Sequence, residues 1–257
     1  YCDFHFPVKA VNFFWYKTGW PPLDYFFRTR LDLTHSPTPL ILPTRGKKIV
    51  TVYDLFFMDY PNMADRLAKR NFFNKIADSV HEADCIVAIS MFTKERLQER
   101  FSIESSKVKV IYLGIDRDLW KEISEEELKR VRSIYKLPSS FLPFVGALEP
   151  RKNLLNLVEA LKIVHEKFEA IPLVLVGRKG QDHKNVMEKI KKFKLESWVS
   201  WVGYVKEKEL KSFYRLASLF VLPSLCEGFG LPLLEAMACQ VPIIISKTSA
   251  LPEIAQD

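Results

Sequence analysis

The sequence of 257 residues predicts an α/β protein with two doubly wound parallel-sheet domains that face each other across a cleft. Short apolar runs alternate with amphipathic segments along most of the chain, as strands and helices do in parallel sheets. The alternation breaks once, over the charged segment 116–140, and then restarts. We therefore expect domains of residues 1–120 and 121–257. Ligands of such folds bind at the carboxyl ends of the strands, so we expect a site in the cleft.

The composition is that of a folded globular protein, with 48% hydrophobic and 27% charged residues. No apolar run approaches the roughly 20 residues of a membrane span. The net charge of +7 is shared by both halves, which argues against a dedicated nucleic-acid-binding face. It suits a protein that handles anionic substrates, and it leaves open a peripheral contact with anionic lipid.

The four cysteines show neither metal-ligand spacing nor a C-x-x-C pair. We expect reduced cysteines and a cytoplasmic protein, at the inner face of the membrane if lipid is contacted. The chain starts at Tyr1, without Met or a visible leader, and we expect both of its ends to be cut.

In the first domain, residues 1–30 are rich in aromatic side chains, which we expect to pack in a core or between domains. A membrane-contacting patch is the alternative. From residue 31 onward, β-branched runs predict strands and 3.6-residue periodicity predicts helices. The expected strands are 31–35, 48–55, 85–90 and 108–113, and the expected helices are 66–83 and 93–101.

In the second domain the same reasoning gives a strand–helix alternation up to the C-terminal end. Segment 116–140 is charged and ends in a Pro-Ser-Ser turn, so we assign it to a linker that contains a helix. The expected strands are 144–148, 173–177, 199–202, 219–224 and 241–246, and the expected helices are 154–168, 186–193, 210–217 and one that begins near Pro232.

The turn before this last helix is the most informative stretch of the chain. Gly228 and Gly230 permit positive φ and a close approach of the backbone to a ligand. Pro232 fits the first helical turn, where its missing N–H costs nothing. Free amides and the helix dipole at this start predict a binding site for an anion such as phosphate.

Two carboxylates frame the turn, Glu227 before the glycines and Glu235 about one turn into the helix. Carboxylates near a phosphate site suit hydroxyl groups as partners, as in dinucleotide-binding folds that hold a ribose on an acidic residue. The residues alone leave two interpretations open: a ribose on Glu235 with a second hydroxyl-rich group near Glu227, or two solvated glutamates.

A second turn of this kind overlaps the carboxyl end of the strand expected at 144–148. Gly146 begins it, and Arg151 and Lys152 stand at its end, just before a helix. Two cations there can hold a diphosphate. A solvated basic pair at a helix start is the alternative.

The stretch from Glu227 to Ala238, E-G-F-G-L-P-L-L-E-A-M-A, resembles the signature of family-4 retaining glycosyltransferases, with its E-x7-E spacing. Gly146 to Asn153 resembles the same family's G-x-x-x-x-R-K-N segment. This resemblance implies the GT-B fold, in which two Rossmann-like domains enclose a nucleotide-sugar site. It covers residues 31–254.

The resemblance also implies roles for individual residues. Glu235 would bind the ribose of the donor nucleotide, and Glu227 would contact the transferred sugar. Lys152 and Arg151 would hold the diphosphate and stabilise its charge as it leaves. The donor would also meet the backbone of the turn and, through its base, the backbone near Val205, where an ordinary core valine is the alternative. The turn residues concerned are Gly228, Phe229, Gly230 and Leu231.

The first domain departs from the family pattern. Thr51 to Leu55 reads T-V-Y-D-L where the family has T-V-H-D-L, so Tyr53 replaces a histidine that touches the donor. A tyrosine can donate a hydrogen bond but carries no positive charge near neutral pH. The family's N-terminal glycine-rich loop has no counterpart, and His35 is expected to be structural.

The triplet Asp116-Arg117-Asp118 matches the D-x-D that metal-dependent glycosyltransferases of another fold use for a divalent cation. Here it ends the first domain, and we expect it to be structural. We therefore expect no metal and no cofactor apart from the nucleotide-sugar substrate.

The resemblance implies a retaining hexosyltransferase that moves a mannose- or glucose-type sugar from a nucleotide diphosphate to a glycan, lipid-linked glycan or polysaccharide precursor. Two alternatives stay open: transfer to a small sugar or sugar phosphate, and a nucleotide-sugar-binding module or weakly active partner subunit. A nicotinamide-dependent dehydrogenase is disfavoured because no G-x-G-x-x-G opens the first helix of either domain.

Overall fold

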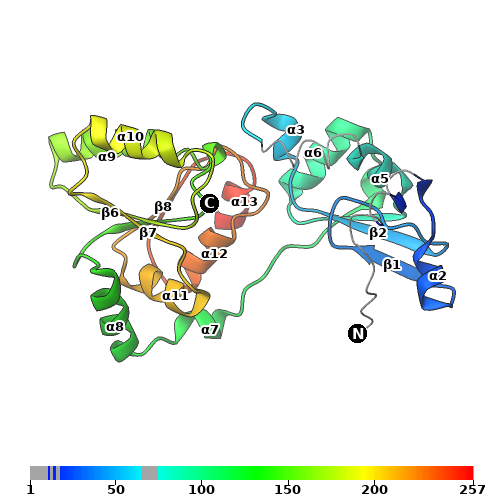
Figure 1. Ribbon diagram of the computed structural model, residues 1–257, viewed down its shortest axis with the longest axis horizontal. Helices are drawn as coiled ribbons and strands as arrows, with labels where there is room; N and C mark the ends of the chain where they lie inside the picture. The colour runs from blue at the N-terminus through cyan, green and yellow to red at the C-terminus, as the bar shows by residue number, and fades with distance from the viewer. Residues whose placement is uncertain (1–10, 12–13, 16–17, 65–74, 257) are drawn as a thin grey trace. The chain divides into compact units, whose positions relative to one another are not determined.

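Strands and helices alternate along the chain, and every strand pairing is parallel (Figure 1). The computed structural model describes residues 11, 14–15, 18–64 and 75–256. It divides into two compact units, Tyr1–Tyr112 and Leu113–Asp257. The predicted α/β class with parallel sheets is confirmed.

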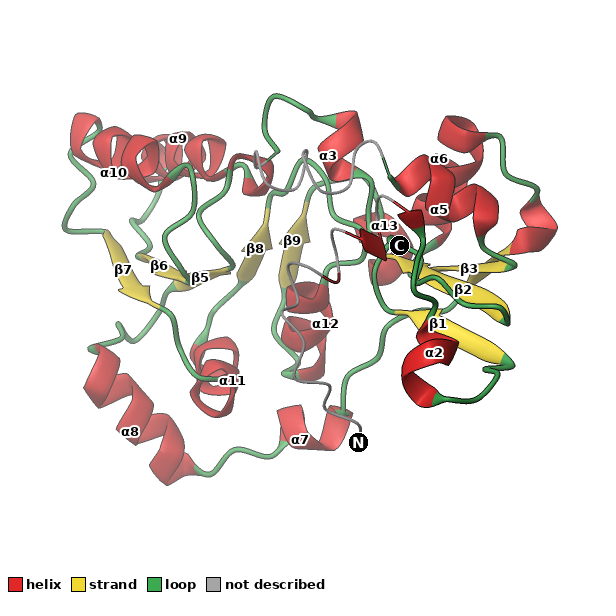
Figure 2. Ribbon diagram, turned by 45° about the vertical axis from the view of Figure 1, so that its right-hand side comes forward, coloured by secondary structure: helices red, strands yellow, loops and turns green. Residues whose placement is uncertain are grey.

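Unit 1 contains a four-stranded sheet in the order β1-β2-β3-β4. Because consecutive strands are neighbours, each connection crosses over in the same direction. Helices α3, α5 and α6 lie on one side of this sheet (Figure 2). The described elements are α2 (Leu23–Phe27), β1 (Leu33–Ser36), β2 (Lys47–Val52), α3 (Phe56–Asp59), α5 (Ile76–Glu82), β3 (Cys85–Ala88), α6 (Met91–Phe101), the 3-10 turn η1 (Ser105–Lys107) and β4 (Val108–Val110).

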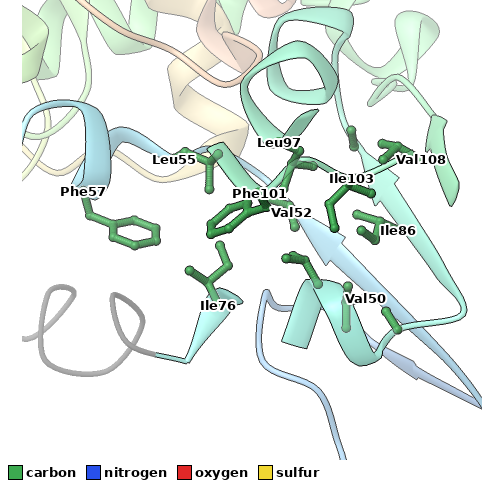
Figure 3. Packing of buried hydrophobic residues seen from close by; sticks show 13 residues of the cluster. Val50, Val52, Leu55, Phe57, Ile76, Ile86, Leu97, Phe101, Ile103 and Val108 are labelled. Carbon is green, nitrogen blue, oxygen red and sulfur yellow. The ribbon is translucent and has the colours of Figure 1, made fainter. Parts of the chain in front are cut away.

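The core of unit 1 lies between this sheet and its helices. Val50, Ile86, Ile76 and Leu97 are fully buried there, and Figure 3 shows them pointing toward one another from two strands and two helices. One face of each helix is buried, which explains why apolar residues recur at helical spacing in the sequence. Of the predicted helix 66–83, residues 66–74 lie outside the described residues, and α5 accounts for most of the rest.

Unit 2 contains two groups of paired strands, β5-β6-β7 and β8-β9, and β8 lies beside β5. Helices α9 and α10 lie on one side and α11 and α12 on the other (Figures 1 and 2). The elements are α7 (Arg117–Lys121), α8 (Glu125–Tyr135), β5 (Leu142–Val145), the 3-10 turn η2 (Pro150–Lys152), α9 (Leu154–Lys167), β6 (Leu173–Val176), α10 (His183–Lys192), β7 (Val199–Gly203), α11 (Glu207–Leu216), β8 (Phe220–Leu222), α12 (Leu231–Ala238), β9 (Ile243–Ile245) and α13 (Leu251–Ala255).

All four residues of β5 and of β6 are buried, as expected for strands with helices on both faces. From β5 the chain builds outward through β6 to β7, and it then returns to place β8 on the other side of β5. The strand order therefore reverses between β5 and β8. Such a switch point leaves a crevice outside the carboxyl ends of the two strands.

The division between the units lies at Tyr112 and Leu113, whereas the sequence suggested a boundary after Trp120. Trp120 is buried, and its ring meets the ring of Tyr214 edge-on at 5.9 Å between centroids. Its carbonyl accepts a hydrogen bond from the thiol of Cys239. These contacts attach α7 to unit 2, and a charged sequence pattern does not report such packing.

The Asp116-Arg117-Asp118 triplet forms the start of α7. Asp116 caps this helix, because its carboxylate accepts hydrogen bonds from the amides of Asp118 and Leu119, both at 3.2 Å. An aspartate whose carboxylate accepts hydrogen bonds from two first-turn amides is a favourable N-cap, which gives Asp116 a structural role.

Candidate functional site

The loops that leave β5 and β8 meet at the switch point of unit 2. Gly146 to Lys152 follow β5, and Pro223 to Gly230 follow β8. Two hydrogen bonds join the loops: the Leu225 amide donates to the Arg151 carbonyl at 2.8 Å, and the Asn153 side chain donates to the Pro223 carbonyl at 3.0 Å. Asn153 takes the left-handed conformation at φ 60°, which asparagine tolerates well.

Helix α12 begins at this point, directly after Gly230. Gly230 has φ 100°, a backbone conformation that residues other than glycine rarely adopt. Leu231 and Pro232 form the first positions of the helix, and the Leu233 amide closes the turn onto the Gly230 carbonyl at 2.9 Å. The amides of a helical first turn have no acceptor within the helix, so this end can take an anion.

Next to this helix start lies a cluster of buried charges. Lys152 is 5% exposed and Glu227 is 6% exposed, and the Lys152 ammonium lies 2.5 Å from Glu227 Oε1. Arg151 donates from Nη1 to Glu227 Oε2 at 2.8 Å, and its Nε reaches Glu149 at 3.0 Å. The hydroxyl of buried Ser224 donates to Glu227 Oε1 at 2.6 Å. Both oxygens of Glu227 are therefore engaged by protein groups.

The two buried partners titrate differently from exposed groups. Burial by itself raises the pKa of Glu227, but the attraction of Lys152 and Arg151 outweighs it and holds this pKa below its ordinary value. Burial lowers the pKa of Lys152, and attraction to Glu227 offsets only part of that effect. Near neutral pH the Glu227 carboxylate is ionised and serves as the anion for two cations.

The loop from β9 to α13 fixes the backbone of Glu227. The Glu227 amide donates to Ser249 Oγ at 2.9 Å, and the Ala250 amide donates to the Glu227 carbonyl at 3.3 Å. No sequence motif by itself marks Ser224, Ser249 or Asn153 as site residues. Ser224 carried a usable signal, because it stands three residues before Glu227 at the end of an apolar run.

Glu235 lies in α12 with its carboxylate on the side of α11. Its Oε2 accepts a hydrogen bond from the Tyr214 hydroxyl at 2.7 Å, and Tyr214 is fully buried. Burial raises the pKa of Glu235, and the hydrogen bond from Tyr214 offsets only part of this effect. Oε1 has no hydrogen-bond partner among the described residues, so one acceptor is left for a ligand.

The remaining donor-site candidates of unit 2 surround these groups. Gly146 follows β5, and a Cβ at this position would lie 3.5 Å from the Lys152 side chain. Val205, at the end of β7, is 4% exposed, so its side chain belongs to the core and only its backbone can meet a ligand. Gly228 and Phe229 are buried in the turn, whereas Leu231 is 39% exposed. The structure thus gathers these residues in one unit.

Tyr53 lies in unit 1, where it follows β2 and is 43% exposed. Its carbonyl accepts a hydrogen bond from Thr93 Oγ1 at 3.3 Å, so its backbone is fixed while the ring faces outward. His35 on β1 pairs with Thr51 Oγ1 at 2.8 Å. That contact between neighbouring strands agrees with a structural role for His35.

Within the described residues, no three His, Cys, Asp or Glu side chains gather as they would around a metal ion. In the same part of the chain, no helix is both long enough and apolar enough to cross a membrane.

Comparison with known proteins supplies the family. Residues 125–257 match the model of the glycosyl transferases group 1, and residues 7–119 match that of glycosyltransferase family 4. An O-antigen chain mannosyltransferase B of Escherichia coli is 28% identical over 94% of this chain and 62% of its own length. The chain therefore spans about three fifths of that relative.

Two solved structures share the fold. Sucrose-phosphate synthase from Thermosynechococcus elongatus matches with a TM-score of 0.70 and 22% identity, over 95% of this chain and 60% of that one. Anabaena HepE in complex with UDP and glucose matches with a TM-score of 0.65 and 21% identity, over 81% of this chain and 55% of that one. Together with the two family matches, these likenesses show that the chain belongs to the family-4 retaining glycosyltransferases, the glycosyl transferases group 1, which have the GT-B fold.

Proposed function

We propose that the protein transfers a mannose- or glucose-type hexose from a nucleotide diphosphate sugar to a glycan, lipid-linked glycan or polysaccharide precursor, with retention at the anomeric carbon. The observation that carries the proposal is the buried cluster of Lys152, Arg151 and Glu227 beside the start of α12. Two cations and a helix N-terminus form a site for a diphosphate.

In this proposal the diphosphate takes over the role that Glu227 has in the structure. Two phosphoryl groups bring more negative charge and more acceptor oxygens than one carboxylate, so Lys152 and Arg151 turn toward them. The amides of Gly230 and Leu231 add the field of α12, which is worth at most about 2 kcal/mol. The two side chains therefore supply most of the charge stabilisation.

The nucleoside extends from the diphosphate toward α11. Oε1 of Glu235 accepts a hydrogen bond from a ribose hydroxyl while Tyr214 holds Oε2 and fixes the orientation. The base lies against the backbone of Gly203 to Val205 at the end of β7. Backbone groups leave no side-chain signature, so the base is a matter for measurement.

The transfer step is a substitution at the anomeric carbon. The bond from this carbon to the diphosphate oxygen breaks, and a bond to the acceptor hydroxyl oxygen forms on the same face. The acceptor proton passes to the departing diphosphate. Lys152 and Arg151 stabilise the charge that develops on the leaving group, and Glu227, released from them, stabilises the positive charge on the sugar.

The names of the relatives favour mannose as the transferred sugar, and they are compatible with two kinds of acceptor. The E. coli relative is an O-antigen chain mannosyltransferase, which favours mannose and a polysaccharide precursor. A mannosylfructose-phosphate synthase of Agrobacterium fabrum is 26% identical over 84% of this chain, which favours a small sugar acceptor as the second candidate. The described cysteines Cys85, Cys226 and Cys239 are thiols outside any disulfide bond, which suits a reaction in the cytoplasm.

The test is thermal stabilisation of the chain by UDP, GDP and ADP, alongside Glu235→Ala and the matched control Glu188→Ala on the surface of α10. One nucleotide at about 100 times its Kd stabilises by about 2.7 kcal/mol, and we expect Glu235→Ala alone to abolish the shift. No shift with any nucleotide would contradict the donor site. Binding of a nucleotide sugar without transfer of its sugar to any acceptor would favour a binding module.

A further inference from the structure

Three arginines gather in unit 1 at the amino ends of its strands. Arg28 and Arg30 lie between α2 and β1, and Arg45 lies just before β2. Tyr53 follows the other end of β2, whose six residues span about 20 Å at about 3.3 Å per residue. This place is therefore distinct from the carboxyl edge of the sheet, where parallel-sheet proteins bind their substrates.

None of the three guanidinium groups has a hydrogen-bond or ion-pair partner within the part of the chain that the structure describes. Other cations at this edge do have partners: Lys47 reaches Asp84 at 2.7 Å, and Lys48 reaches Glu82 at 3.6 Å. Among the described residues, the three arginines are therefore cations without an ion pair, although the carboxylates of Asp32, Glu82 and Asp84 line a cavity with Arg30 and Arg45.

The arginines line two cavities of about 370 Å³ each, which share Arg30 and Arg45. Trp20, Tyr25 and Arg28 complete one of them. Trp20 is 64% exposed and Tyr25 is 69% exposed, with ring centroids 6.5 Å apart. We call the cavity lined by Trp20, Tyr25, Arg28, Arg30 and Arg45 the arginine pocket.

Among the described residues that line the arginine pocket, Asp24 is the acidic one, and its carboxylate is engaged by donors other than the guanidinium groups. It is 7% exposed, and its carboxylate accepts hydrogen bonds from the Leu31 amide, the Thr44 hydroxyl and the Arg45 amide, each at 3.0 Å. The two backbone hydrogen bonds lower the pKa of Asp24 to about 2. Asp24 thus fastens the segment that carries Arg30 to the segment that carries Arg45, without neutralising either guanidinium.

Gly46 gives an independent sign that these two segments are held together. A Cβ at this position would lie 2.0 Å from the Leu31 carbonyl oxygen and 2.7 Å from that of Asp32, so only glycine allows this approach. The Lys47 amide also donates to the Asp32 carbonyl at 2.9 Å. The backbones that carry the arginines are therefore prearranged, which lowers the entropic cost of binding an anion.

We propose that the arginine pocket binds the phosphate group of a phosphorylated ligand, with the organic part of the ligand against Trp20 and Tyr25. A planar guanidinium group forms paired hydrogen bonds with phosphate oxygens. The three guanidinium groups of the pocket together offer more N–H donors than the single carboxylate of Asp24 can accept. The phosphate comes from a soluble phosphate ester or from a lipid headgroup. The proposal does not depend on the donor site of unit 2.

The test follows the fluorescence of Trp20 in the full chain during titration with inorganic pyrophosphate, with Trp20→Phe to identify the signal from the pocket. We expect the double variant Arg30→Gln/Arg45→Gln to weaken this binding about tenfold or more, since two charge-assisted contacts are lost. Lys107→Gln/Lys109→Gln removes the same charge elsewhere in unit 1 and should bind like the wild type. Equal affinities in the two double variants would overturn the proposal.

Two further titrations identify the source of the phosphate, with glucose 1-phosphate and with vesicles of phosphatidylglycerol against phosphatidylcholine. Loss of either interaction in Arg30→Gln/Arg45→Gln, but not in the control variant, supports the pocket and assigns its ligand. If pyrophosphate, the sugar phosphate and the anionic vesicles all fail to bind the wild type, the proposal is wrong. Arg28→Gln provides a second variant should the double variant fail to fold.

Discussion

At the scale of single residues, the Glu227 carboxylate has one role in the structure and a second role in the proposed function. Without a donor, Glu227 neutralises Lys152 and Arg151 and makes their burial tolerable. In the proposed function, the diphosphate of the donor replaces Glu227 as the partner of these cations and frees it for the sugar. Burial of a charge without a partner is costly, so the same residues that prepare the site also stabilise the fold.

Glu227→Gln should destabilise the chain by about 3–5 kcal/mol, because it leaves the buried Lys152 without its anion. The double variant Lys152→Met/Glu227→Gln removes the unpaired charge and should recover part of the loss. Chemical denaturation of the three proteins measures both effects. A Glu227→Gln chain as stable as the wild type would show that the cluster contributes nothing to folding.

The same variant should alter the dependence of stability on pH. Because the folded-state pKa of Glu227 lies below its unfolded value, about 4.3, its contribution is complete above that value. The contribution is lost as the pH falls through the folded-state pKa. Between neutral and acidic pH, the free energy of unfolding should therefore fall less steeply for Glu227→Gln than for the wild type. Equal slopes in the two proteins would contradict the assignment.

At the scale of elements, the site depends on three loops more than on the strands they follow. The loops after β5, β8 and β9 are joined through Asn153, Leu225 and Ser249, and α12 starts only because Gly230 turns the chain. Strand pairing within the sheet fixes where these loops begin. The hydrogen bonds between the loops then fix the positions of the charged side chains.

Gly230→Ala should cost about 1–3 kcal/mol and weaken nucleotide binding, because alanine is strained at φ 100° and the amides of α12 shift. Gly114→Ala is the matched control, since a Cβ there meets nothing within 4 Å and the position has no positive φ. Melting temperatures and nucleotide affinities of the two variants give the comparison. Equal behaviour of both would show that the turn geometry is not required.

At the scale of the whole molecule, each unit has its own core, and unit 2 contains every donor-site candidate except Tyr53. Arg151, Lys152, Glu227 and Glu235 all belong to its single doubly wound arrangement. A unit with its own core and its own ligand groups can bind without the other unit.

A chain limited to residues 113–257 should therefore fold and bind the same nucleotide as the whole chain. Circular dichroism reports the fold, and calorimetric titration reports the affinity. A folded unit 2 that does not bind would show that unit 1 contributes an essential contact, with Tyr53 as the first candidate to examine.

The sequence by itself determined the α/β class, the order of most elements and the family. Apolar periodicity is a local property, and the residues of the E-G-F-G-L-P and R-K-N segments are readable without a structure. It also placed Gly230 at a turn and Pro232 in the first turn of a helix, because both residues restrict the backbone directly.

Only the tertiary structure decided which groups meet. It attached α7 to unit 2 through Trp120, paired Glu227 with Lys152, which lies 75 positions earlier in the sequence, and joined Glu235 to Tyr214. It also showed that Asp24 joins two backbone segments, and that Arg28, Arg30 and Arg45 have no ion-pair partner among the residues that the structure describes. Such partners are set by which strands adjoin and how their loops pack, and no local pattern in the sequence encodes that proximity.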